Sequence, residues 1–122
     1  MGKPFNIKDR LKSFVYAGKG IYTLICSEHN AWIHCAAIVL VTIAGFYFNI
    51  TKGEWIAIVF CYGLVLAAEA FNTAIEKLVD LVSPERNPLA GKVKDLAAGA
   101  VLICAIAAAI IGAIIFVPYF FN

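Results

Sequence analysis

Apolar and polar positions fall in long blocks along this chain, and the blocks predict helices that cross a membrane. Residues 31–51 and 97–117 contain no Asp, Glu, Lys or Arg. A helix of about 20 apolar residues crosses the roughly 30 Å hydrocarbon core of a bilayer. Residues 55–76 form a third stretch of similar length, which carries Glu69 and Glu76 towards its end. We therefore expect three transmembrane helices within a single domain, residues 1–122.

The residues before the first span have a different pattern. Between residues 7 and 26, apolar side chains recur at helical spacing on one face, whereas Lys8, Lys12 and Lys19 lie mostly on the other side. An amphipathic helix with a basic face directly before a membrane span is typical of a helix that lies in the headgroup plane. The predicted fold class is all-α integral membrane, with an N-terminal amphipathic surface helix and three transmembrane helices.

Positive charge is distributed unevenly between the predicted loops. Basic residues precede the first span and separate the second span from the third: Lys3, Lys8, Arg10, Lys12 and Lys19, then Lys77, Arg86, Lys92 and Lys94. The loop between the first two spans has only Lys52, and no basic residue follows Val117. The positive-inside rule then predicts a cytoplasmic N-terminus and second loop, with the C-terminus outside.

Composition supports a membrane protein and excludes several other classes. The chain is 62% hydrophobic with a mean hydropathy of +0.85, compared with about 45–50% apolar residues in soluble domains. Because the basic residues are accounted for by membrane topology, no nucleic-acid partner is expected. The four cysteines are scattered without a C-x-x-C pair, so they are interpreted as small apolar residues and not as metal ligands.

A stripe of polar residues interrupts the second span. Spacings of three, seven and eleven place Glu69, Asn72, Glu76 and Asp80 within a sector of roughly 80° on one helix face. A carboxylate at bilayer depth costs about 2.5–3.5 kcal/mol on insertion scales. Such a stripe therefore needs a partner helix, a cation or a polar substrate.

The acids and bases expected on the cytoplasmic side are suited to phosphoryl transfer. Acids at Glu28, Glu76 and Asp80 suit Mg²⁺, which binds a few carboxylates together with phosphate oxygens. Cations are expected near the same face, where they can neutralise phosphates: Arg10, Lys12, Lys19 and Lys94. Glu69 lies about 10 Å deeper than Glu76 along the helix, a depth that suits a general base acting on a hydroxyl group in the lipid.

Three alternatives remain at this point. The acids can simply pair with cations of a neighbouring helix. The chain can be a small proton- or ion-conducting membrane protein, or an accessory subunit without activity. A conducting protein usually needs one intramembrane acid, whereas several acids and cations gather here, which favours phosphoryl transfer over ion conduction.

Three sequence motifs resemble those of the prokaryotic diacylglycerol kinase family, which includes the undecaprenol kinases of Gram-positive bacteria. The longest is E-A-F-N-T-A-I-E-K-L-V-D, residues 69–80. K-D-L-A-A-G-A-V-L at residues 94–102 and E-H-N-x-x-I-H at residues 28–34 match as well. The resemblance extends from about Arg10 to Pro118.

The resemblance implies an ATP- and Mg²⁺-dependent lipid kinase of the bacterial cytoplasmic membrane, a homotrimer with active sites shared between subunits. It would transfer the γ-phosphate to the hydroxyl of a membrane lipid alcohol, undecaprenol or diacylglycerol. Glu69 would be the general base with Asn72 beside it, and Glu28 and Glu76 would be metal ligands. Implied nucleotide contacts are Lys12, Tyr16, Lys19, Glu85, Arg86, Asn87, Lys94 and Asp95, with Arg10 and Asp80 as further contacts to lipid or nucleotide.

One of these motifs and one further segment bear on the lipid substrate. E-H-N-x-x-I-H and V-S-P-E-R-N-P-L-A, residues 82–90, are more similar to the undecaprenol kinase branch than to the diacylglycerol kinases of enteric bacteria.

Overall fold

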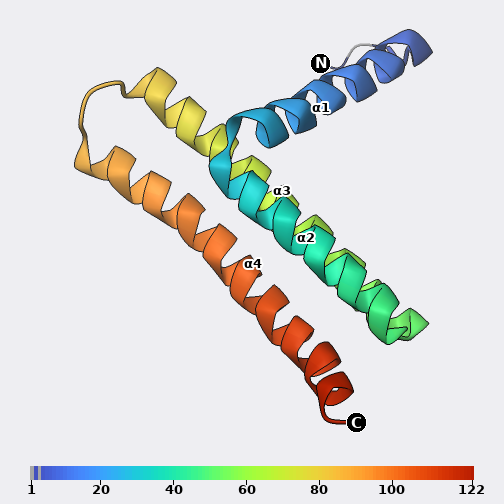
Figure 1. Ribbon diagram of the computed structural model, residues 1–122. Coiled ribbons are helices and arrows are strands. Elements are labelled where there is room, and N and C mark those ends of the chain that lie inside the picture. The colour runs from blue at the N-terminus through green and yellow to red at the C-terminus, as the bar shows by residue number, and fades with distance from the viewer. Residues whose placement is uncertain (1, 3) are drawn as a thin grey trace.

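The chain forms four helices in the part that the structure describes. The structure is a computed structural model that describes residue 2 and residues 4–122. The helices are α1 (Ile7–Ser27), α2 (His29–Phe48), α3 (Lys52–Val82) and α4 (Pro88–Phe120), as Figure 1 shows. The last three are long and apolar enough to cross a membrane, so the predicted helical fold class is confirmed. Lys3, one of the predicted N-terminal basic residues, lies outside the described residues.

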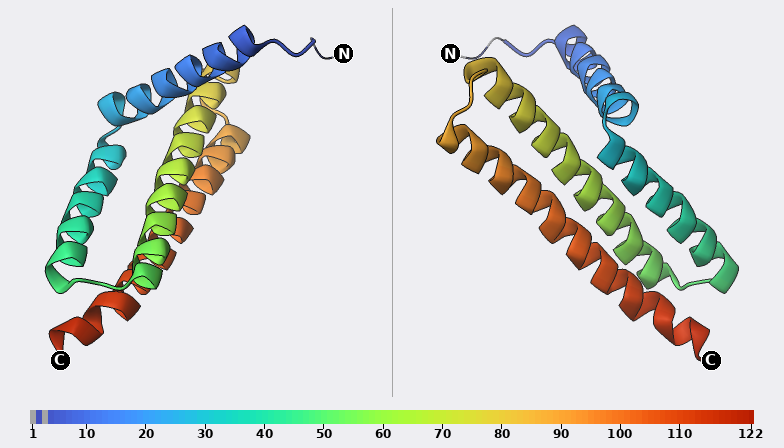
Figure 2. Two further views of the ribbon diagram at one scale, coloured as in Figure 1. Left: turned by 90° about the vertical axis from the view of Figure 1, so that its right-hand side faces the viewer. Right: turned by 60° about the vertical axis from the view of Figure 1, so that its left-hand side comes forward.

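Helix α1 is set apart from the other three. Asn6 caps its N-terminus by accepting a hydrogen bond of 2.9 Å from the backbone N–H of Lys8. A single extended residue, Glu28, separates α1 from α2. This break turns the chain, so that α1 lies across the end of the bundle at which α3 is joined to α4 (Figure 2). Leu24 is its one buried side chain among the described residues, so the rest of the chain leaves most of its apolar face uncovered.

The opposite end of the bundle is fixed by a tight turn. Asn49 ends α2 in the left-handed conformation, with φ 53°. Thr51 and Glu54 then form a capping box that starts α3. Tyr119 of α4 donates a hydrogen bond to Glu54, and Ile58 of α3 and Ile115 of α4 pack in the same apolar cluster. These contacts hold the ends of α2, α3 and α4 together.

Helices α3 and α4 extend further than the apolar stretches predicted. Their 31 and 33 residues correspond to about 46 and 50 Å at 1.5 Å per residue, longer than the roughly 30 Å hydrocarbon core. Helix α4 begins at Pro88, a favoured first position. It continues through Pro118, which lies in the last turn, where its missing N–H removes a single hydrogen bond. The apolar stretches stop short of the end at which α3 and α4 are joined, so the end of α3, the loop at residues 83–87 and the start of α4 are expected to project beyond the hydrocarbon. They lie at the same end of the molecule as α1 (Figures 1 and 2).

Candidate active site

The predicted stripe on α3 is divided by burial into two levels. Glu69 and Asn72 are buried, whereas Glu76 and Asp80 are exposed towards the projecting end of the helix. Glu69 is the largest fully buried side chain, with 1% of its surface exposed. Along one helix face, one carboxylate is thus buried inside the helix bundle and two more are left exposed.

Helix α2 contributes the partner of the buried carboxylate. His34 Nε2 lies 3.5 Å from Glu69 Oε2, and the exposed fractions of the two side chains are 19% and 2%. This distance allows an ion pair but exceeds a hydrogen bond of ordinary length, and Oε2 has no hydrogen-bond partner among the described residues. A buried carboxylate left without a hydrogen bond is costly and is typical of a functional site.

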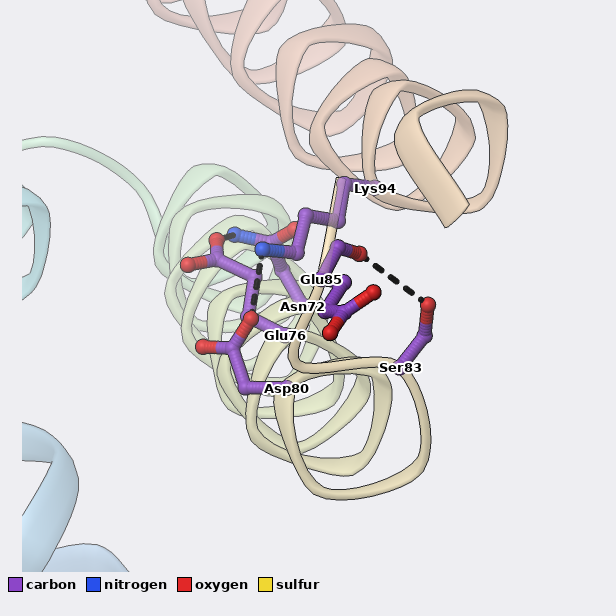
Figure 3. A network of polar contacts seen from close by, with 6 residues as sticks. All are labelled: Asn72, Glu76, Asp80, Ser83, Glu85 and Lys94. Atoms are coloured by element: carbon purple, nitrogen blue, oxygen red, sulfur yellow. Dashed lines mark hydrogen bonds and ion pairs between the residues drawn. The ribbon is translucent and has the colours of Figure 1, made fainter. Parts of the chain in front are cut away.

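Asn72 connects the two levels. Its side-chain amide donates a hydrogen bond of 2.8 Å to Glu76 Oε1, visible in Figure 3. Its carbonyl oxygen Oδ1 and the hydroxyl of Thr73 are buried without a hydrogen-bond partner in the described part of the chain. Buried polar atoms are nearly always paired in folded proteins, so these two unpaired atoms, together with Glu69 Oε2, set this part of α3 apart from an ordinary packed helix face.

The exposed level is completed by α4 and the loop that precedes it. Lys94 Nζ donates a hydrogen bond of 2.6 Å to Asp80 Oδ1 (Figure 3). Lys94 precedes the apolar stretch of α4, and the hydrogen bond to Asp80 raises its pKa, so that it remains a cation. A shallow cavity of about 310 Å³ lies here. Its charged and polar lining includes Asp80, Glu85, Arg86, Asn87 and Lys94.

Two loop residues also have structural roles at this cavity. The Ser83 hydroxyl donates a hydrogen bond of 3.3 Å to the backbone carbonyl of Glu85. Asn87 Oδ1 accepts a hydrogen bond of 2.9 Å from the backbone N–H of Leu89 and caps α4. The loop is therefore ordered by its own hydrogen bonds, with the side chain of Arg86 exposed beside them.

The remaining predicted nucleotide contacts are not joined to the stripe within one chain. Arg10, Lys12, Tyr16 and Lys19 are exposed on α1, and Lys19 Nζ lies 5.8 Å from the centre of the Tyr16 ring. Among the described residues, no hydrogen bond or ion pair links these four side chains to α3. Asp95 is exposed and lines a separate cavity on α4.

The predicted metal ligands lie on different elements. Glu28 is half-buried at the junction of α1 and α2, and Glu76 is exposed on α3. In residues 2 and 4–122, no group of three His, Cys, Asp or Glu side chains is arranged to hold a metal ion. Mg²⁺ does not require such a group, because one or two carboxylates suffice when phosphate oxygens and water complete its shell. The oxygen chemistry of Glu28 and Glu76 therefore fits a metal that arrives with a nucleotide.

Sequence reasoning assigned no role to His34. A signal was present, because His34 is a polar residue inside the apolar stretch at residues 31–51, and polar residues at membrane depth are commonly functional. The spacing of polar residues in the sequence did not indicate that α2 packs against α3, or that His34 lies opposite Glu69.

The fold and the site together define an integral membrane protein with a carboxylate-rich site at one end of its helices. The chain belongs to the prokaryotic diacylglycerol kinase family, whose model matches residues 15–116. It is 44% identical over 107 residues to an undecaprenol kinase of Bacillus subtilis, covering 88% of this chain and 87% of that protein.

Two diacylglycerol kinases are more distant. The protein from Synechocystis is 37% identical over 109 residues, covering 88% of this chain and 62% of that protein. The protein from Escherichia coli is 27% identical over 110 residues, with 90% of each chain covered. The predicted family is confirmed, and the protein is a lipid kinase. As a kinase it is expected to take its phosphate from ATP.

Proposed function

We propose that this kinase transfers the γ-phosphate of Mg·ATP to the hydroxyl of a polyprenol such as undecaprenol. The observation that carries the proposal is the two-level stripe on α3, with buried Glu69 below exposed Glu76. A reaction between a soluble nucleotide and a membrane alcohol needs a site at each depth. The greater identity to the undecaprenol kinase than to the diacylglycerol kinases supports the choice of lipid.

In the proposed reaction each level has a separate part. The lipid oxygen attacks the γ-phosphorus, the bond from that phosphorus to the bridging oxygen of ADP breaks, and the hydroxyl proton passes to Glu69. Glu28 and Glu76 would hold Mg²⁺, which would neutralise charge on the phosphates. Lys94 and the loop at residues 85–87 contact the nucleotide, where positioning and charge stabilisation supply most of the catalysis.

An apolar cavity beside Glu69 supports an apolar acceptor. The cavity has a volume of about 430 Å³ and is lined by residues of α2, α3 and α4. Alanine and branched side chains dominate its lining, and His34 brings it next to Glu69. A hydrocarbon chain held there would keep its terminal hydroxyl near the buried carboxylate.

The test is phosphate transfer in lipid vesicles. The purified protein, given ATP labelled at the γ-phosphate, should label undecaprenol faster than diacylglycerol or ceramide, and removal of Mg²⁺ by a chelator should stop the reaction. Faster labelling of diacylglycerol would overturn the choice of lipid. Proton flux without lipid phosphorylation would favour the ion-conducting alternative.

We further propose that the enzyme is a homotrimer whose sites are shared between subunits, as the family resemblance implies. A cavity of about 380 Å³ lies beside Asn72. Ala67 and Ala97 are among the small residues that line it, and small residues favour close helix packing in membranes.

Complementation in mixed trimers should reveal the sharing. Asp95 lies on a separate cavity of α4, so we expect it to serve a neighbour's site. Glu69→Gln and Asp95→Asn subunits are each expected to be nearly inactive alone. When equal amounts of the two subunits assemble at random into trimers, about a quarter of the sites combine an intact Glu69 from one subunit with an intact Asp95 from its neighbour. Lipid phosphorylation should therefore recover to about a quarter of the wild-type rate. Mixed trimers as inactive as the parents would place both residues in the same subunit's site.

The same arrangement supports the proposed orientation in the membrane. Helix α1 and the loop at residues 83–87 lie at the same end of the bundle (Figure 2). Half of the ten basic residues belong to these two regions, and Lys77, Lys92 and Lys94 flank the loop in sequence. We therefore propose that this end faces the cytoplasm, where ATP is available, and that the C-terminus lies outside.

A further inference from the structure

His34 lies between the buried carboxylate of Glu69 and the apolar cavity. Its Nε2 is 3.5 Å from Glu69 Oε2, and its side chain lines the cavity of about 430 Å³. The ring comes from α2 and the carboxylate from α3, so the contact joins two separate helices. Oε2 has no hydrogen bond elsewhere in the described chain, which leaves His34 as its nearest polar partner there.

We propose that His34 is a positioning residue that holds Oε2 of Glu69 and keeps the carboxylate directed at the acceptor hydroxyl. The inference rests on the proposed role of Glu69 as the general base. Bases in active sites are commonly oriented by a third group, and contacts that are long in the free enzyme shorten when substrate binds. A glutamate has several rotatable bonds, and misplacing a reacting group by about 1 Å can cost about 10²-fold in rate.

The competing explanation is that His34 only fills space between α2 and α3. The two explanations differ in what the loss of the ring should change. A space-filling residue affects assembly and stability whatever stands at position 69. A positioning residue acts through Glu69, so its contribution disappears once Glu69 is replaced.

The experiment is a double-mutant cycle on the full-length protein in lipid vesicles, with polyprenol and Mg·ATP as substrates. His34→Ala should lower kcat about tenfold or more, with little change in KM for Mg·ATP. In the Glu69→Gln background the same substitution should cause no further loss, because coupled residues are not additive. His29→Gln is a matched control, since His29 is the other histidine of α2 and is exposed. Its kcat should stay at the wild-type value.

A pair of conservative variants makes the test independent of whether His34→Ala assembles. The amide nitrogen of Gln lies near the position of Nε2, whereas that of Asn lies near Nδ1. His34→Gln should therefore keep most of the wild-type kcat, and His34→Asn should lose as much as His34→Ala.

Three outcomes would overturn the inference. Wild-type kcat in both His34→Ala and His34→Asn would show that the ring does not act on the base. An equal fractional loss in the wild-type and Glu69→Gln backgrounds would show that His34 acts independently. Wild-type kcat in Glu69→Gln itself would remove the proposed base, and with it the inference, whereas the first two outcomes leave the proposed function standing.

Discussion

Replacing Glu69 with Gln should lower the turnover of lipid phosphorylation by about 10²-fold or more, the usual scale for loss of a general base. Gln keeps the size of the side chain but cannot accept the hydroxyl proton. The buried position of Glu69 and its distance along α3 from Glu76 place it at the depth of a lipid alcohol. The measurement is kcat in vesicles at saturating Mg·ATP and saturating lipid.

The KM for Mg·ATP distinguishes a general base at Glu69 from a metal ligand at the same position. The KM for Mg·ATP should change little in Glu69→Gln, because the buried level of the stripe is not expected to touch the phosphates. Glu54→Gln is a suitable control, since Glu54 is another carboxylate of α3 but lies at the opposite end, hydrogen-bonded to Tyr119. It should leave turnover unchanged. A Glu69→Gln enzyme that loses nucleotide affinity while keeping turnover at saturation would place Glu69 in the metal site, and Asp80 or Asp95 would be the next candidates for the base.

The apolar stretches of the sequence predict the number and order of the helices but not their ends. Hydropathy marks where a helix leaves hydrocarbon, and the helix itself continues as long as its backbone hydrogen bonds persist. Helix α3 therefore runs on to Val82, and α4 begins at Pro88 instead of near residue 97. Pro118 does not end α4, since two more helical residues follow it.

The stripe itself could be predicted because helical spacing alone places residues on one face. The partners of its members could not, because they depend on how α2 and α4 pack against α3. The contact of His34 with Glu69 joins residues 35 positions apart, and that of Lys94 with Asp80 joins residues 14 apart. The capping role of Asn87 was also missed, although Asn directly before a proline at a helix start is a recognisable signal.

Replacing Glu76 with Gln should abolish most lipid phosphorylation while the protein still assembles. The carboxylate is the hard, charged oxygen ligand that Mg²⁺ requires, and an amide of the same shape lacks the charge. Glu76 is exposed at the projecting end of α3 and accepts a hydrogen bond from Asn72. Its position therefore allows both contact with a soluble nucleotide and orientation by a buried neighbour. Activity should be measured as a function of Mg²⁺ concentration, with size-exclusion chromatography to follow assembly.

The Mg²⁺ titration separates a ligand from a residue that only orders α3. Loss of a ligand raises the Mg²⁺ concentration needed for half-maximal activity, so excess Mg²⁺ should recover part of the activity of Glu76→Gln. Lys77→Gln provides the comparison, because Lys77 is the next residue of the same helix and is also exposed, but it points about 100° away from Glu76 around the helix. Its Mg²⁺ dependence should match the wild type. Wild-type turnover of Glu76→Gln at low Mg²⁺ would mean that the metal is held elsewhere, and Glu28 together with Asp80 would then be the carboxylates to test.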